Sequence, residues 1–221
     1  MLYVHDAYAV MGEREFDFED AVREGYASAI ADDDTRFLRY LQSVHSSAEG
    51  YLVVTLTALR DGAALDRLAQ RLRYGDLSGY FTHLSGMRYQ ARSTLLVRAD
   101  WADAPDVDLA SVPVGGAEHP VAWFREDTLE GKGVNAALST LASRPAKSDD
   151  VLALEAAFQP ALDTDTAARL LYRIADKERL TAAWATDAGW GDWPGSLTSA
   201  LPEGARGSGR YLRSARWSPM S

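Results

Sequence analysis

The most constraining feature of the sequence is a repeat of about half its length. Residues 51–70 read YLVVTLTALRDGAALDRLAQ, which is an apolar strand pattern, an Arg-Asp break and then an amphipathic helix pattern. Residues 169–184, RLLYRIADKERLTAAW, follow the same order, and Asp61 is matched by Asp176, 115 positions later (176 − 61). The segment 96–101, LVRADW, is likewise matched by 212–217, LRSARW, 116 positions later (217 − 101). Such a period indicates duplication of one α+β unit.

Alternating and helical patterns predict the same order of elements in both halves: strand, helix, strand, strand, helix, strand. In the first half the expected strands are 2–10, 36–45, 51–60 and 89–101, with apolar helical stripes over 18–30 and 65–84. The first stripe is Phe18, Val22, Tyr26 and Ile30, and Gly75 interrupts the second. In the second half the expected strands are 121–129, 151–162, 169–175 and 211–219, with helices at 134–141 and from 180 onward. Residues 189–195 and 204–209 are rich in Gly and are expected to be loops.

The stretch between the halves has the composition of a linker. Residues 102–119 contain two Pro and a Gly-Gly pair and show no periodicity. We therefore expect a first repeat at residues 1–101, a linker at 102–119 and a second repeat at 120–221. Each βαββαβ repeat is the ferredoxin-like α+β pattern, with the third strand between the first and the second, the second at an edge, and the helices on one face. The helix-free face needs a cover, and the sheet of the other repeat, packed face to face at about 10 Å, is the obvious one.

Composition restricts the class of partner. The chain has 221 residues, 47% of them hydrophobic and 25% charged, as in ordinary globular proteins. Its formal net charge of −9 argues against nucleic acid and anionic membrane surfaces, because both bind basic faces. It contains no Cys, which excludes disulfides and thiolate chemistry. The N-terminal MLYVHDAYAV is unlike a signal peptide, and no apolar run approaches the roughly 20 residues that span a bilayer, so we expect a cytoplasmic protein.

Three segments carry a resemblance to a known superfamily. The opening LYVHDAYAVMGEREFDF, the hairpin from RFLRYLQSVHSS to YLVVTLTALRDGAALDRLAQRL, and the closing LLVRADW, echoed by YLRSARWSPM, resemble the dimeric α+β barrel superfamily. The first half resembles its NIPSNAP-like branch, and the whole chain resembles a tandem member. The resemblance implies two ferredoxin-like sheets packed face to face, often with a pocket between their helix-free faces, and it is compatible with a homodimer. Members include cofactor-free oxygenases, isomerases, lyases, haem enzymes and proteins without known activity, so the resemblance implies a pocket rather than a reaction.

The first strand carries the main candidates for catalysis, which are His5, Asp6 and Tyr8. Successive strand residues face opposite sides, so His5 shares one face with Tyr3, whereas Asp6 shares the other with Tyr8. Only one of these faces can line a pocket, and the sequence leaves open which. A His, or an Asp with a Tyr, could transfer protons near neutral pH in a dry pocket. The alternative is structural: a buried His bonded to the backbone, or an Asp paired with an Arg.

The other candidates lie on later elements. His45 ends the second strand and could orient a substrate or simply be solvated; two strand spacings, at least about 9.5 Å, separate it from His5. Tyr40 could donate a proton or bind substrate, and His83, late in a helix, could bind substrate or only interact with the helix dipole. Phe124 is the second-repeat match of His5. We therefore expect the first repeat to supply the polar groups and the second to supply apolar walls.

No pattern in the sequence indicates a cofactor. There is no metal-ligand spacing, no dinucleotide or phosphate loop and no nucleophile elbow. The resemblance implies that a tandem haem member would use an axial His in its second repeat, and here none follows His119. We therefore expect no metal, flavin or haem. The leading hypothesis is a cofactor-independent lyase or isomerase that acts on a small hydrophobic molecule by acid–base catalysis. The alternatives are a cofactor-free monooxygenase and a non-catalytic ligand-binding or assembly module.

Overall fold

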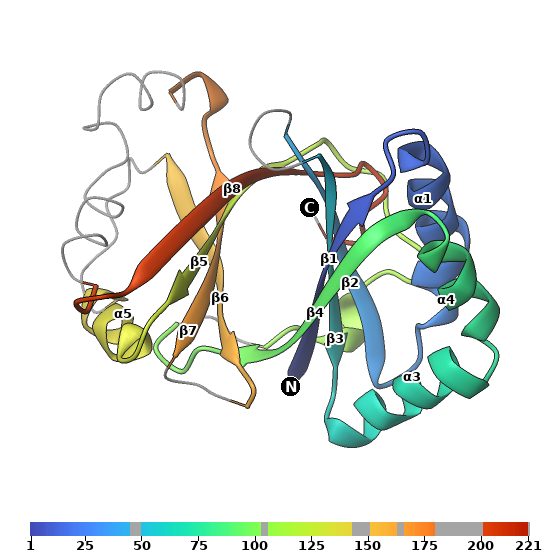
Figure 1. The fold of residues 1–221 in the computed structure, drawn as a ribbon, viewed down its shortest axis with the longest axis horizontal. Helices are drawn as coiled ribbons and strands as arrows, with labels where there is room; N and C mark the ends of the chain where they lie inside the picture. The colour runs from blue at the N-terminus through green and yellow to red at the C-terminus, as the bar shows by residue number, and fades with distance from the viewer. Residues whose placement is uncertain (45–49, 103–105, 143–150, 163–165, 180–200, 221) are drawn as a thin grey trace. The chain divides into compact units, whose positions relative to one another are not determined.

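The computed structural model describes the chain except for residues 45–49, 103–105, 143–150, 163–165, 180–200 and 221 (Figure 1). The chain forms two compact units. The first is Met1–Leu96 with Asp106–Val121 and Arg213–Ser221, and the second is Val97–Pro105 with Ala122–Leu212. The sequence predicts a first repeat that ends at residue 101 and a linker that ends at residue 119, and these domain limits remain a prediction. Among the described residues, no helix is both long enough and apolar enough to cross a membrane.

The first unit contains a four-stranded antiparallel sheet. β1 (Leu2–Val10) pairs on one side with β3 (Tyr51–Leu59) and on the other with β4 (Arg88–Arg98). β3 pairs in turn with β2 (Thr35–Ser43). The strand order is therefore β4-β1-β3-β2, the ferredoxin-like order that the sequence predicts.

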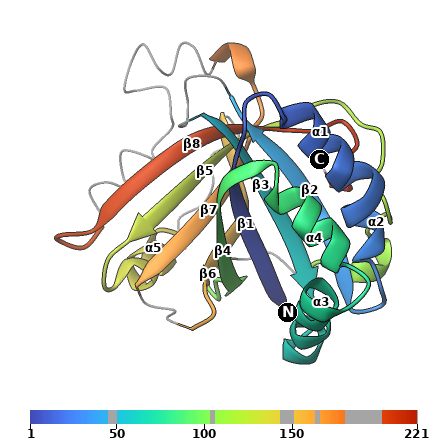
Figure 2. The same ribbon diagram turned by 45° about the vertical axis from the view of Figure 1, so that its right-hand side comes forward.

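Helices cover one face of this sheet (Figures 1 and 2). The predicted stripe of Phe18, Val22, Tyr26 and Ile30 is buried, and it runs along α1 (Glu15–Ala21), the π-helix η1 (Val22–Tyr26) and α2 (Ala27–Ala29). In an α-helix with 3.6 residues per turn, each step of four residues rotates the side-chain direction about the helix axis by about 40° beyond a full turn. The wider π turn rotates it back in the opposite direction. The π turn therefore explains how a spacing of four keeps one face to the core.

The next helix shows that the two repeats share a capped turn. α3 (Gly62–Tyr74) begins after Asp61, whose Oδ1 accepts a hydrogen bond from the backbone N–H of Ala64 at 2.9 Å. It ends at Gly75, the predicted interruption, and α4 (Ser78–Ser85) follows. In the second repeat the Oδ1 of Asp176 accepts from the backbone N–H groups of residues 178 and 179 at 2.9 and 3.1 Å. The matched aspartates thus make the same local structure.

The end of the chain completes the first unit along β2. The backbone N–H groups of Ala215 and Met220 donate to carbonyl oxygens of β2, so this strand is not the edge strand that the sequence predicts. Trp217 is buried here. Its ring stacks on Phe37 with centroids 6.0 Å apart, and its Nε1 donates to Glu19 Oε1 at 2.8 Å. The C-terminal segment is therefore part of the core of the first unit.

The second unit repeats this plan. β5 (Trp123–Glu130) pairs with β7 (Ala167–Ile174), and β7 pairs with β6 (Leu152–Pro160). β8 (Arg206–Ser214) lies beside β5, which gives the order β8-β5-β7-β6. α5 (Val134–Ala142) packs on one face through Val134 and Leu138. Trp101, the match of Trp217, again donates its indole N–H to a side chain next to the sheet, Asn135 Oδ1 at 3.2 Å.

Predictions for the end of the second repeat have different outcomes. The helix expected from residue 180 and the loop expected at 189–195 lie outside the described residues. The loop expected at 204–209 is wrong in part, because β8 already begins at Arg206. A Cβ on Gly209 would clash with Asp127 Oδ1, and a Cβ on Gly207 would lie 3.0 Å from a methyl group of Leu129. These glycines therefore allow neighbouring side chains to lie close to the backbone of β8, and they do not form a turn.

A β-bulge occurs at nearly the same place in both sheets. The register shifts by one residue at Leu38 in β2 and at Glu155 in β6, 117 positions later (155 − 38). In a regular strand Arg36 and Arg39, three positions apart, would face opposite sides. The extra residue at Leu38 turns both to the same side of the first sheet.

Candidate functional site

The face of the first sheet opposite α1–α4, called the first back face, carries three rows of paired residues. The registers across β4, β1, β3 and β2 define the rows Leu96–Tyr3–Ala58–Arg36, Thr94–His5–Leu56–Arg39 and Arg92–Ala7–Val54–Leu41. None of these residues belongs to the cluster that packs under the helices. The first back face therefore combines aliphatic side chains with a small number of basic ones.

The middle row places a His and an Arg at a defined spacing. His5 and Arg39 pair with Leu56 from its two sides, so their Cα atoms lie two strand spacings apart, about 9.5 Å. Each residue is only 4% exposed. Side chains at this spacing can reach two parts of one small ligand. An imidazole can take up a proton near neutral pH, and a guanidinium can stabilise the negative charge that forms.

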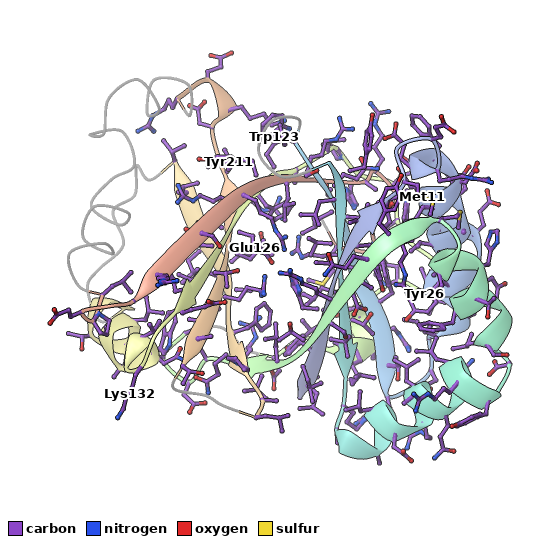
Figure 3. All side chains as sticks on the ribbon, in the orientation of Figure 1. Met11, Tyr26, Trp123, Glu126, Lys132 and Tyr211 are labelled. Atoms are coloured by element: carbon purple, nitrogen blue, oxygen red, sulfur yellow. The ribbon has the colours of Figure 1, made fainter. Side chains whose placement is uncertain are left out.

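The other two predicted catalytic residues of β1 lie on the helix-covered face. Tyr8 packs against Phe18 with ring centroids 5.3 Å apart, and the guanidinium of Arg88 lies 4.9 Å from the Tyr8 centroid. Burial raises the pKa of Tyr8 well above its ordinary value, and the charge of Asp6, to which the hydroxyl donates, raises it further. Burial also raises the pKa of Tyr26, which lies between the helices and the sheet (Figure 3). Both tyrosines therefore stay protonated at neutral pH.

The remaining candidates from the first repeat do not join His5. His45 lies outside the described residues. Tyr40 is on the helix-covered face of β2, where burial raises its pKa. His83 is an exposed residue of α4 and lines a groove of about 430 Å³ beside α1 and η1. Acidic groups of this groove are paired with arginine, as Asp17 is with Arg14 at 2.8 Å.

The face of the second sheet opposite α5, called the second back face, carries Phe124, the match of His5. Phe124 is fully buried, and the guanidinium of Arg173 lies 5.2 Å from its ring centroid. Two positions on lies Glu126, which is labelled in Figure 3 and is 4% exposed. It forms ion pairs with Arg169 and Arg210. The second repeat, for which the sequence predicts apolar walls, therefore also has charged side chains on the face that carries Phe124.

Sequence reasoning missed Arg39, Glu126, Arg169 and Arg210. Arg210 follows an exposed stretch of β8, whereas the other three lie in strands whose neighbouring residues are mostly buried. A charged group inside a buried strand costs free energy unless it is paired, so this position is itself a signal that could have found them. Within the described ranges, no group of three or more His, Cys, Asp or Glu side chains is arranged to hold a metal ion.

Comparison with known proteins finds likeness at the level of structure. No protein-family model matches the chain, and no curated protein sequence matches it. A "putative monooxygenase" from Lactobacillus acidophilus is similar over 99% of this chain and 96% of its own, with a TM-score of 0.56 and 10% identity. An "anthrone oxidase-like protein" is similar over 100% of this chain and 95% of its own, with a TM-score of 0.52 and 9% identity. A NIPSNAP domain protein from Burkholderia xenovorans, 19% identical, aligns with 48% of this chain and 100% of its own, with a TM-score of 0.40.

The first two likenesses establish the fold. Almost the whole chain has an equivalent in each of these structures, although the identity is 10% or less. The predicted architecture, an α+β chain of two tandem ferredoxin-like repeats, is therefore confirmed. At this identity the likeness extends to the fold alone.

Proposed function

We propose that this protein is an enzyme for a small apolar molecule, that it needs no bound cofactor, and that His5 removes a proton from its ligand. The observation that supports this most is the middle row of the first back face, where buried His5 and Arg39 flank Leu56. The imidazole acts as the base, and the guanidinium stabilises the anion that forms. Asp6 and Tyr8 take no part, because they lie on the other face of β1.

The fate of the anion distinguishes three reactions. Return of the proton to a different atom is an isomerisation, loss of a leaving group is a lyase reaction, and attack on O₂ is an oxygenation. In the oxygenation, a CH₂ group and O₂ give a carbonyl group and water, so no external electron donor is needed. The names of two structural neighbours, a "putative monooxygenase" and an "anthrone oxidase-like protein", make oxygenation the first reaction to test. The ligand class is an aromatic compound with an acidic C–H bond.

The test uses 1,8-dihydroxyanthrone, which has an acidic CH₂ group and consumes O₂ when it is oxidised. Oxygen uptake with the wild-type protein should exceed the spontaneous rate, and His5→Gln should lower the enzymatic part about 10²–10⁴-fold, as expected for loss of a general base. His119→Gln is the matched control. Both ring nitrogens of His119 face backbone carbonyl oxygens, of Pro120 and Ser218, so its role is structural. Unchanged uptake by a folded His5→Gln protein would overturn the assignment of the base.

A non-catalytic binding module is the second candidate function. The observation that favours it is Arg39, a buried cation that could hold an anionic ligand without any reaction. This candidate predicts that 1,8-dihydroxyanthrone quenches tryptophan fluorescence in a saturable way while oxygen uptake stays at the spontaneous rate. A homodimer also remains a prediction, and light scattering after gel filtration measures it.

A further inference from the structure

Two arginines of the second back face share one buried carboxylate. Glu126 of β5 is 4% exposed. Arg169, on the neighbouring strand β7, places its Nη1 3.3 Å from Glu126 Oε1. Arg210, on β8, binds the other oxygen, Oε2, through Nε and Nη2. The carboxylate is thus held from the strands on both sides of β5.

This cluster has more positive than negative charge. Among the described residues, Glu126 is the acidic partner of both arginines, and neither arginine has a second one. Arg173 is different, because it has a carboxylate of its own, Glu155, at 3.1 Å. The side chains of Arg169 and Arg210 are only 18% and 20% exposed, so the excess charge is largely removed from water. A cation in such a position favours the binding of an anion.

A buried donor supports the same conclusion. The Nε of Arg169 is buried and has no hydrogen-bond partner within the part of the chain that the structure describes. A buried donor without an acceptor destabilises the folded state, so each such group calls for an explanation. Apolar side chains lie next to the cluster, since Phe158 pairs with Arg169 and Leu171 pairs with Glu126. A ligand that combines an acceptor anion with an aromatic ring matches both features.

We propose that Arg169 and Arg210 form an anion-binding subsite for the carboxylate of a small aromatic acid. The planar guanidinium groups match a carboxylate in geometry as well as in charge. The ring of the ligand contacts Phe158 and Leu171, which an inorganic anion would leave uncovered. This subsite is independent of the role proposed for His5, and each can fail without the other.

Salicylate is the probe for this subsite. In an NMR titration of the wild-type protein, the Nε–Hε signal of Arg169 should shift and reach saturation. Arg169→Gln and Arg210→Gln should each weaken binding about 10-fold or more, as expected for loss of a charge-assisted hydrogen bond. Glu126→Gln should tighten binding, because the competing carboxylate is removed, whereas a purely structural cluster gives no tightening. Arg206→Gln, an exposed position on β8, is the matched control and should leave the affinity unchanged.

A neutral ligand distinguishes anion binding from general apolar binding. Salicylamide has nearly the same shape as salicylate but no charge, so it should bind at least about 10-fold more weakly. The proposal is overturned if salicylamide binds equally well, or if about 10 mM salicylate leaves the Arg169 signal unmoved. If Arg169→Gln fails to fold, the wild-type titration and the change in affinity of Glu126→Gln decide the outcome.

Discussion

Asp6→Asn separates a structural role from a catalytic one on the first strand. Asp6 lies on the helix-covered face of β1, where the Tyr8 hydroxyl donates to its carboxylate. Asn keeps an acceptor oxygen but loses the charge. A hydrogen bond to a charged group contributes about 1.5–3 kcal/mol and a neutral one about 0.5–1.5 kcal/mol, so the free energy of unfolding should fall by about 1–2 kcal/mol. For a chain of this size the melting temperature should then fall by roughly 2–8 °C.

Urea unfolding followed by tryptophan fluorescence measures this loss, and a double-mutant cycle with Tyr8→Phe tests the pairing. The two losses should be less than additive, because both variants remove the same hydrogen bond. Oxygen uptake with 1,8-dihydroxyanthrone should be unchanged in Asp6→Asn, whereas His5→Gln should lose it. An Asp6→Asn protein of wild-type stability that has lost turnover would refute this reasoning, and would assign the chemistry to the helix-covered face of β1.

Two further variants test the packing of the first unit. Trp217→Ala should lower the free energy of unfolding by about 3–5 kcal/mol, because it removes a buried aromatic side chain and its hydrogen bond to Glu19; a loss below about 1 kcal/mol in urea would contradict the packing. Asp61→Asn should flatten the dependence of the melting temperature on pH. The hydrogen bond from the backbone N–H of Ala64 is the main cause that lowers the pKa of Asp61 in the folded state. The charged carboxylate therefore stabilises the fold at a pH above the unfolded-state pKa of about 3.9, and this stabilisation is lost as the pH falls. Identical curves for wild type and variant between about pH 3 and 6 would argue against this cap.

The order of elements could be predicted because periodicity is a local property. The limits of β1 agree with the prediction residue for residue, and Gly75 separates two helices as expected. The π-helix at Val22–Tyr26 could not be predicted, because a spacing of four residues fits either a drifting α-helix or one wider turn. Packing of the stripe against the sheet decides between them. The prediction that β2 is an edge strand failed for a similar reason, because the segment that bonds to β2 comes from the far end of the chain.

The candidate site could be predicted only in part. Alternation along a strand places His5 and Asp6 on opposite faces of the sheet. Which of these faces the helices cover depends on the tertiary structure. The row of His5, Leu56 and Arg39 depends on the registers of three strands, and the side that Arg39 faces depends on the bulge at Leu38. Register and bulges are set by contacts between distant segments, so a short window of sequence does not report them.

The back faces carry arginines although the chain as a whole is acidic. The formal net charge is −9, yet the described rows of the first back face include Arg36 and Arg39 and no Asp or Glu. On the second back face, Arg169 and Arg210 share Glu126. Each back face therefore presents cationic side chains that can stabilise a nearby anion. An enzyme that removes a proton benefits from such a field, because the field stabilises the anion that forms and not the neutral ligand before it. A neutral apolar molecule gains nothing from such a field, whereas the anion formed in the proposed proton removal does, as does an anionic ligand held by a binding module.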